Sequence, residues 1–180
     1  MANKTTIALG VTGSIAAYKA ADLCSRLTKQ DFDVHVLMTQ AAGKLVGEQT
    51  FFTLSRNPVL SSLWTLPDWQ PGHIALAERA RLLVIAPCTA NFIGKYTHGI
   101  ADDALTTYAL SHAGPVILAP AMNPVMWKNP AVEDNVKLLK ARGVHFVGPS
   151  EGSVACGASG IGRMAEVEAI IDAINKKLNS

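Results

Sequence analysis

Short apolar runs alternate along the chain with longer stretches in which apolar residues recur every three or four positions. Several runs are apolar at successive positions, a pattern typical of strands that helices cover on both faces. We predict strands at residues 6–11, 33–38, 82–87, 115–120 and 144–148. We predict helices at residues 14–30, 48–56, 74–80, 90–111 (as two pieces), 131–142 and, to close the chain, 167–178.

This alternation predicts the fold class. A βαβα order indicates a doubly wound parallel sheet, Rossmann-like or flavodoxin-like, with right-handed crossovers and helices on both faces. The 180 residues suit one α/β domain, 1–180. Ligands of such sheets bind beyond the carboxyl ends of the strands, so we expect the chemistry there.

Composition narrows the classes of partner. The net charge is +2 with scattered basic residues, which argues against a nucleic-acid surface, and no apolar run is long enough for a membrane span. The charged fraction of 17% is below the roughly 25% that is typical, which favours surface hidden in a cofactor site or an oligomer interface. The three cysteines are odd in number and far apart, so we expect a cytoplasmic protein without a disulfide framework or a Cys-x-x-Cys metal site.

Two strand ends carry candidate phosphate contacts. The Gly13-Ser14 turn follows the first strand and opens a helix, whose free N–H groups and dipole suit a phosphate. It is neither a P-loop nor a Gly-x-Gly-x-x-Gly motif, and Ser14 as a helix cap is an equal alternative. Thr39 ends the second strand where a dinucleotide fold would place an acid, which favours a mononucleotide; Thr39 is a phosphate donor or a helix cap.

The next two strand ends are built differently. The third is followed by Cys88, Thr89, Ala90 and Asn91, small enough to let backbone approach a flat ligand. After the fourth, Asn123 and Pro124 form a good helix start, but a cap does not explain the apolar residues around it, which read as walls. These are Met122, Met126 and Trp127.

Two candidates lie away from the strand ends. His73 follows a Pro-Gly turn at a predicted helix start, where the dipole favours the neutral imidazole, although a solvated or capping role is an alternative. Residues 148–164 are rich in glycine around Cys156. They read as a substrate flap that delivers an acid, or as a flexible connector.

Together these segments resemble a known family. The segments "GVTGSIAAYKAADL", "HIALAERA", "APAMNPVMW" and "ACGASGIGRM" are similar to those of the homo-oligomeric flavin-containing cysteine decarboxylases, which include phosphopantothenoylcysteine decarboxylase of coenzyme A biosynthesis. The resemblance implies FMN as cofactor and 4'-phosphopantothenoylcysteine as substrate. It places FMN contacts on Gly13, Ser14, Ile15, Thr39, Cys88, Thr89, Ala90, Asn91 and Ala121.

The resemblance also implies roles for the other candidates. FMN would oxidise the substrate cysteine to a thioaldehyde, CO2 would depart, and re-reduction would give 4'-phosphopantetheine. His73 would be the base or orienting group, Asn123 would bind the substrate carboxylate or amide, and Cys156 would protonate the enethiolate. Met126 and Cys156 would also contact the substrate, and no metal is implied. Members assemble as trimers or trimer-based dodecamers with FMN at the subunit interface.

Alternatives stay open at this point. A peptidyl-cysteine decarboxylase of the lantibiotic type shares the flavin, the histidine and the asparagine. A flavin prenyltransferase-like protein lacks the asparagine block and the flap cysteine, and a non-catalytic flavoprotein lacks the histidine. The chain departs from the family pattern at Glu78–Arg81, where a basic residue and "WAD" are usual, and at Ala158 and Ile161 in the flap. Since many bacterial relatives continue into a second domain, the length leads us to expect a monofunctional protein.

Overall fold

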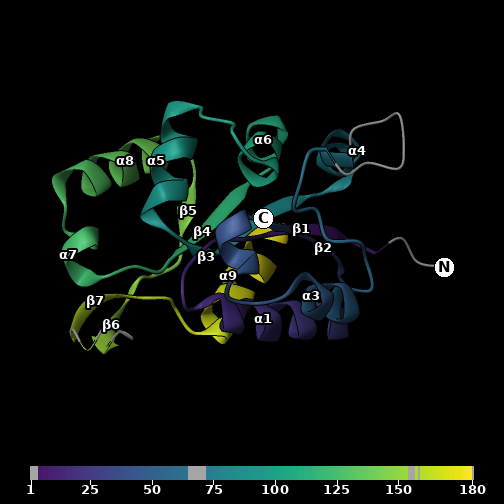
Figure 1. Ribbon diagram of the computed structural model, residues 1–180, viewed down its shortest axis with the longest axis horizontal. Coiled ribbons are helices and arrows are strands. Elements are labelled where there is room, and N and C mark those ends of the chain that lie inside the picture. Colours follow the sequence, from purple (N-terminus) through teal and green to yellow (C-terminus); the bar gives the residue numbers. More distant parts are fainter. Residues whose placement is uncertain (1–3, 65–71, 154–156, 158, 180) are drawn as a thin grey trace.

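The fold is organised around a five-stranded sheet in which every neighbouring pair is parallel. The structure, a computed structural model, describes residues 4–64, 72–153, 157 and 159–179. The strands of the sheet are β1 (Thr6–Val11), β2 (Asp33–Met38), β3 (Leu82–Cys88), β4 (Val116–Pro120) and β5 (His145–Phe146). Their spatial order is β2-β1-β3-β4-β5 (Figure 1). This order confirms the predicted doubly wound α/β fold of the flavodoxin-like type.

Helices cover both faces of the sheet (Figure 1). One face carries α1 (Ala17–Lys29), α3 (Glu48–Ser55) and α9 (Val167–Leu178). The other carries α4 (Gly72–Arg79), α5 (Ala90–His98), α6 (Ala104–Ser111) and α8 (Pro130–Ala141). Short helices α2 (Gln40–Gly43) and α7 (Pro124–Trp127) follow β2 and β4, and β6 (Ser150–Ser153) pairs with β7 (Ser159–Arg163) in an antiparallel hairpin. None of the helices in the described ranges is long and apolar enough to cross a bilayer.

The sheet separates two hydrophobic cores. Along β1, Ile7 and Leu9 pack toward α1 and α9, whereas Ala8 between them packs toward the opposite helices. All six residues of β1 are buried, because a strand covered on both faces has no solvent side to which a polar residue could turn. Coverage of the strand by helices on both faces, the predicted cause, therefore explains this apolar run.

Strand β5 is shorter than the predicted 144–148. The N–H of Val144 donates to the carbonyl of Leu139, 3.0 Å away, and so closes the end of α8 instead of joining the sheet. At the other end Gly148 has a φ of +79°, which turns the chain away from the sheet. Helix capping and a glycine turn therefore shorten a run whose composition is that of a strand.

A buried histidine at the end of α6 makes stability depend on pH. His112 is 8% exposed, with Nδ1 3.3 Å from the Tyr108 hydroxyl and Nε2 3.3 Å from the Pro115 carbonyl oxygen. The carbonyl can only accept, so Nε2 carries the proton and Nδ1 accepts from Tyr108. Burial lowers the pKa of His112, although the hydrogen bond to Pro115 opposes this shift.

We therefore expect stability to fall as the pH is lowered through about 6.5, the pKa of an unfolded histidine. Between the folded and unfolded pKa values only the unfolded chain binds the proton, so acid favours unfolding. The loss approaches about 1.4 kcal/mol per unit of difference between the two pKa values. Urea unfolding of the wild type and His112→Gln from pH 7.5 to 5 measures it. The variant should show a smaller slope with pH, and equal slopes would contradict this origin.

Candidate active site

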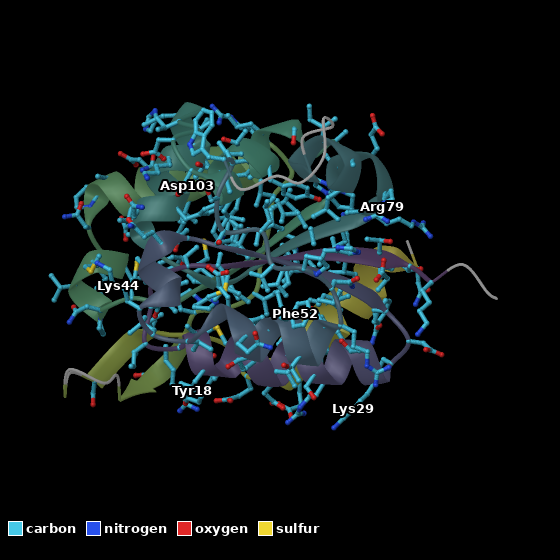
Figure 2. The ribbon with its side chains drawn as sticks, turned by 45° about the vertical axis from the view of Figure 1, so that its right-hand side comes forward. Tyr18, Lys29, Lys44, Phe52, Arg79 and Asp103 are labelled. Atoms are coloured by element: carbon cyan, nitrogen blue, oxygen red, sulfur yellow. The ribbon has the colours of Figure 1, made fainter. Side chains whose placement is uncertain are left out.

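A cavity of about 680 Å³ lies at the carboxyl ends of β1, β2, β3 and β4. The chain leaves β1 and β3 toward opposite faces here, and ligands of doubly wound sheets bind at such switch points. The volume is that of a small-molecule site. Asp103, the N-cap of α6 that is labelled in Figure 2, is one of the lining residues. Most residues predicted to contact the cofactor also line it, namely Gly13, Ser14, Thr39, Thr89, Ala90, Asn91 and Ala121.

The other predicted site residues line the cavity, lie beside it or fall outside the described residues. Met126, predicted to contact the substrate, lines it together with Met122. Ile15 is 60% exposed beside the lining Ser14, and Cys88 is fully buried next to the lining Thr89. The side chain of His73 and the whole of Cys156 lie outside the described residues.

The turn after β1 is shaped for close approach to a ligand. Helix α1 begins at Ala17 rather than at the predicted residue 14, because the Ser14 N–H bonds to the Thr12 carbonyl in a separate turn. The Ser14 hydroxyl accepts weakly, at 3.4 Å, from the N–H of Ala16, which is the N-cap. A Cβ on Gly13 would lie 2.5 Å from the Cβ of Ala41, so only glycine fits. With no acidic residue in its first turn, α1 leaves a positive end toward an anion.

Thr39 at the end of β2 is a helix cap. Its hydroxyl oxygen accepts from the N–H of Ala42 at 3.2 Å and so starts α2. Capping uses the acceptor side of the hydroxyl, and its proton can still be donated to a ligand. The two alternatives from the sequence are therefore compatible.

The end of β3 is fastened to the end of β1 by Thr12. The Thr12 hydroxyl donates to the Pro87 carbonyl at 2.7 Å and accepts from the Thr89 N–H at 3.1 Å. Thr89 in turn caps α5, its hydroxyl accepting from the Phe92 N–H at 3.4 Å. Burial raises the pKa of the Cys88 thiol well above its ordinary value, so this thiol stays un-ionised at neutral pH.

After β4 the chain turns a corner made by residues 121–127. The Ala121 N–H bonds to the Cys88 carbonyl at 2.9 Å, which holds the corner to β3. Asn123 caps α7, its side-chain oxygen accepting from the Val125 N–H at 2.8 Å. Trp127 packs against the core beneath α5 and α8 and does not line the cavity, contrary to the predicted apolar wall. The cap is thus observed, and substrate binding by Asn123 stays a prediction.

The β6–β7 hairpin is docked on this corner. The Met122 N–H donates to the Gly162 carbonyl at 2.9 Å. A Cβ on Gly162 would lie 2.3 Å from the Met122 carbonyl oxygen, so the two backbones touch. Within the described residues, the predicted flap at 148–164 therefore forms two paired strands whose base lies against the cavity wall.

Helix α4 lies far from that corner. His73 is its second residue, and α4 packs against α6. In Figure 1, α4 is at the opposite end of the molecule from α7 and the hairpin. The backbone positions of His73 and Asn123 therefore do not meet within one copy of the chain.

Known proteins resemble this chain in sequence and in fold. The family model described as Flavoprotein matches residues 1–179. The chain belongs to this flavoprotein family.

Two curated relatives are similar to this flavoprotein over nearly its whole length. The coenzyme A biosynthesis bifunctional protein CoaBC of Bacillus subtilis (strain 168) is 44% identical over 179 residues, which cover 98% of this chain and 44% of the relative. The chain thus spans about half the length of the bifunctional relatives. The probable phosphopantothenoylcysteine decarboxylase of Streptococcus mutans serotype c is 43% identical, with 96% of this chain and 98% of the relative covered.

Two solved structures share the fold of this flavoprotein. A cysteine-to-serine mutant of PPC decarboxylase complexed with pantothenoylaminoethenethiol superimposes with a TM-score of 0.88 at 30% identity, covering 99% of this chain and all of that one. The FMN-dependent cysteine decarboxylase SpaF superimposes with a TM-score of 0.84 at 31% identity, covering 97% and 95%.

The charged groups at the cavity of this flavoprotein are paired. The Lys95 ammonium lies 2.8 Å from Asp102 and 4.0 Å from Asp103 and links α5 to the start of α6. Its hydrogen bond lowers the pKa of the Asp102 carboxyl. An ionised, paired carboxylate is a poor proton donor near neutral pH. Within the described part of the chain, no group of three or more His, Cys, Asp or Glu residues is placed to hold a metal.

Sequence reasoning missed several residues of this cavity. Lys95 and Asp102 are separated by a loop whose path the sequence does not reveal. Thr12 had a signal, because it is a polar residue directly after a fully buried strand and so at a ligand-binding edge of the sheet.

Proposed function

We propose that this chain catalyses the FMN-dependent decarboxylation of 4'-phospho-N-pantothenoylcysteine to 4'-phosphopantetheine in coenzyme A biosynthesis. The observation that carries the proposal is the switch-point cavity, which joins the Gly13–Ser14 turn to the corner at 121–127. The names of the relatives, a probable phosphopantothenoylcysteine decarboxylase and bifunctional CoaBC, support it.

The cavity fits FMN in size and in chemistry. Its volume of about 680 Å³ suits a mononucleotide. Gly13, Ser14 and Ile15 with Thr39 would hold the phosphate at the positive end of α1. Residues 88–91 and Ala121 would border the ring through their backbones. The flavoprotein family and the FMN dependence named for SpaF support this cofactor.

In the proposed reaction, FMN supplies the redox chemistry that turns the CH2–SH of the substrate cysteine into a thioaldehyde and later returns the electrons. The C=S group lies β to the carboxylate and takes up the electron pair as CO2 leaves. Asn123 would hold the carboxylate or amide, with Pro124 fixing its backbone, and Met122 and Met126 would exclude water. His73 would take the thiol proton, and Cys156 would donate a proton to the resulting enethiolate.

We further propose that two copies of the chain complete each site, in a trimer or a trimer-based dodecamer with FMN at the interface. The placement of α4 and α7 at opposite ends of the molecule supports this, because His73 belongs to α4 and Asn123 caps α7 (Figure 1). Apolar side chains exposed beside the cavity support it as well, with Ile15, Val125 and Met126 60%, 77% and 48% exposed. A cytoplasmic location is part of the proposal, since the buried Cys24 and Cys88 are free thiols that suit a reducing compartment.

The test is incubation of the FMN-loaded protein with 4'-phosphopantothenoylcysteine and, separately, with a peptide that ends in cysteine. We expect loss of CO2, read as a mass change, from the first substrate only. His73→Asn is the matched control, which should bind FMN but not turn over.

Each other outcome has a clear meaning. Conversion of the peptide alone would assign the chain to the peptidyl-cysteine branch. FMN-bound protein that converts neither substrate would contradict the decarboxylase proposal. A colourless protein that cannot be reconstituted with FMN would contradict the cofactor.

A further inference from the structure

Thr12 is a buried polar residue between two strand ends that line the cavity. It is 1% exposed and stands directly after β1. Its hydroxyl donates to the Pro87 carbonyl at 2.7 Å and accepts from the Thr89 N–H at 3.1 Å. Pro87 lies near the end of β3, and Thr89 directly follows the strand.

The hydroxyl continues the sheet where its backbone ladder stops. Strands β1 and β3 pair in register from Ile7 with Leu82 to Gly10 with Ile85. Two residues beyond Ile85 stands Pro87, which has no N–H to donate. The chain then departs toward α1 on one face and toward α5 on the other. Beyond the Gly10–Ile85 pair, the two hydrogen bonds of the Thr12 hydroxyl join the rims of the crevice.

We propose that Thr12 is a positioning residue for the cofactor: its hydroxyl sets the separation between the two rims of the crevice. It acts through Thr89, which caps α5 and precedes the lining residues Ala90 and Asn91. A flat ligand between the rims needs a fixed gap, because a wider gap loses contact on one side. The expected effect on FMN affinity rests on the proposed FMN site. The hydrogen bonds by which Thr12 joins the two rims do not depend on that site.

Thr97 provides a matched control. It is 3% exposed, and its hydroxyl donates to a carbonyl, that of Ile93, at 2.7 Å. That hydrogen bond lies within α5 and joins no second element, and Thr97 is not among the residues that line the cavity. Thr97→Val therefore removes a buried hydroxyl of the same kind without touching the crevice.

The experiment compares Thr12→Val, Thr12→Ser and Thr97→Val. In cofactor-free protein, amide hydrogen exchange at Thr89 should be at least about tenfold faster in Thr12→Val, since a buried hydrogen bond is lost. It should stay at the wild-type rate in Thr97→Val. FMN titration followed by fluorescence should give a Kd about 10- to 100-fold weaker for Thr12→Val, with Thr12→Ser within about threefold of wild type.

Several results would overturn the inference. One is a folded Thr12→Val that binds FMN like the wild type, and another is an equal loss of affinity in Thr97→Val. A wild type that fails to bind FMN would contradict the proposed function. An unchanged exchange rate of the Thr89 amide in Thr12→Val would refute the role of the Thr12 hydroxyl in holding the two rims. Thr12→Ala replaces the valine variant in the same comparison if the valine variant does not fold.

Discussion

Replacing Cys156 with serine is expected to leave CO2 release intact while lowering the yield of 4'-phosphopantetheine about 10²- to 10⁴-fold, the usual size of general acid catalysis. A serine hydroxyl is a far weaker acid than a thiol, so it cannot protonate the enethiolate. The strand β7 that follows this residue is docked on the corner at 121–127, so an acid carried by the hairpin would lie close to the cavity wall. The unsaturated product should therefore accumulate.

Mass spectrometry of the quenched reaction distinguishes the unsaturated enethiol from the saturated product. Cys24→Ala is the control, because burial raises the pKa of that thiol to about 11 and it lies in α1 away from the cavity. Normal yields of saturated product from Cys156→Ser would refute the acid role.

Replacing Gly162 with alanine is expected to lower kcat about 10²-fold with much less effect on FMN affinity. The new Cβ would meet the Met122 carbonyl oxygen at 2.3 Å and the Pro124 nitrogen at 3.1 Å, so the hairpin has to move off the corner. A displacement of about 1 Å near a reacting centre is enough for a loss of this size. FMN is spared because the Gly13–Ser14 turn is on a separate segment.

Steady-state kinetics and FMN titration measure the two effects on the same preparation. Gly43→Ala is the matched control, since a Cβ there meets nothing within 4 Å. That variant should keep wild-type kinetics. Wild-type kcat in Gly162→Ala would show that the docked position of the hairpin does not matter for turnover.

The main elements of the fold were predictable because burial dictates composition. The strands at Thr6–Val11 and Asp33–Met38 match their predicted bounds; the first is buried at every position, and the second buries Val34 and its last three residues. The split of 90–111 into α5 and α6 was also predicted, and it falls at Gly99, which has a φ of +70°. Positions that must be apolar because they are buried can therefore be recognised from the sequence.

The remaining parts depend on contacts between distant segments. Strands β6 and β7 contain glycine, which has low strand propensity, and their pairing is accompanied by a contact of the hairpin with the corner. The Thr12 bonds join residues 75 and 77 positions apart. The candidate residues after each strand were predictable from topology, but the Lys95 pairing was not, because loop paths are set by packing.

The two separate cores of the sheet also bear on how this sequence can change over time. A substitution beneath α1 and α9 and another beneath α5 and α8 touch different side chains, so their effects on stability should add. Substitutions can therefore accumulate in one core independently of those in the other. At the carboxyl edge this independence ends, because a single threonine joins the chain leading to one face with the chain leading to the other. Epistasis between the faces is thus concentrated where the ligand would bind.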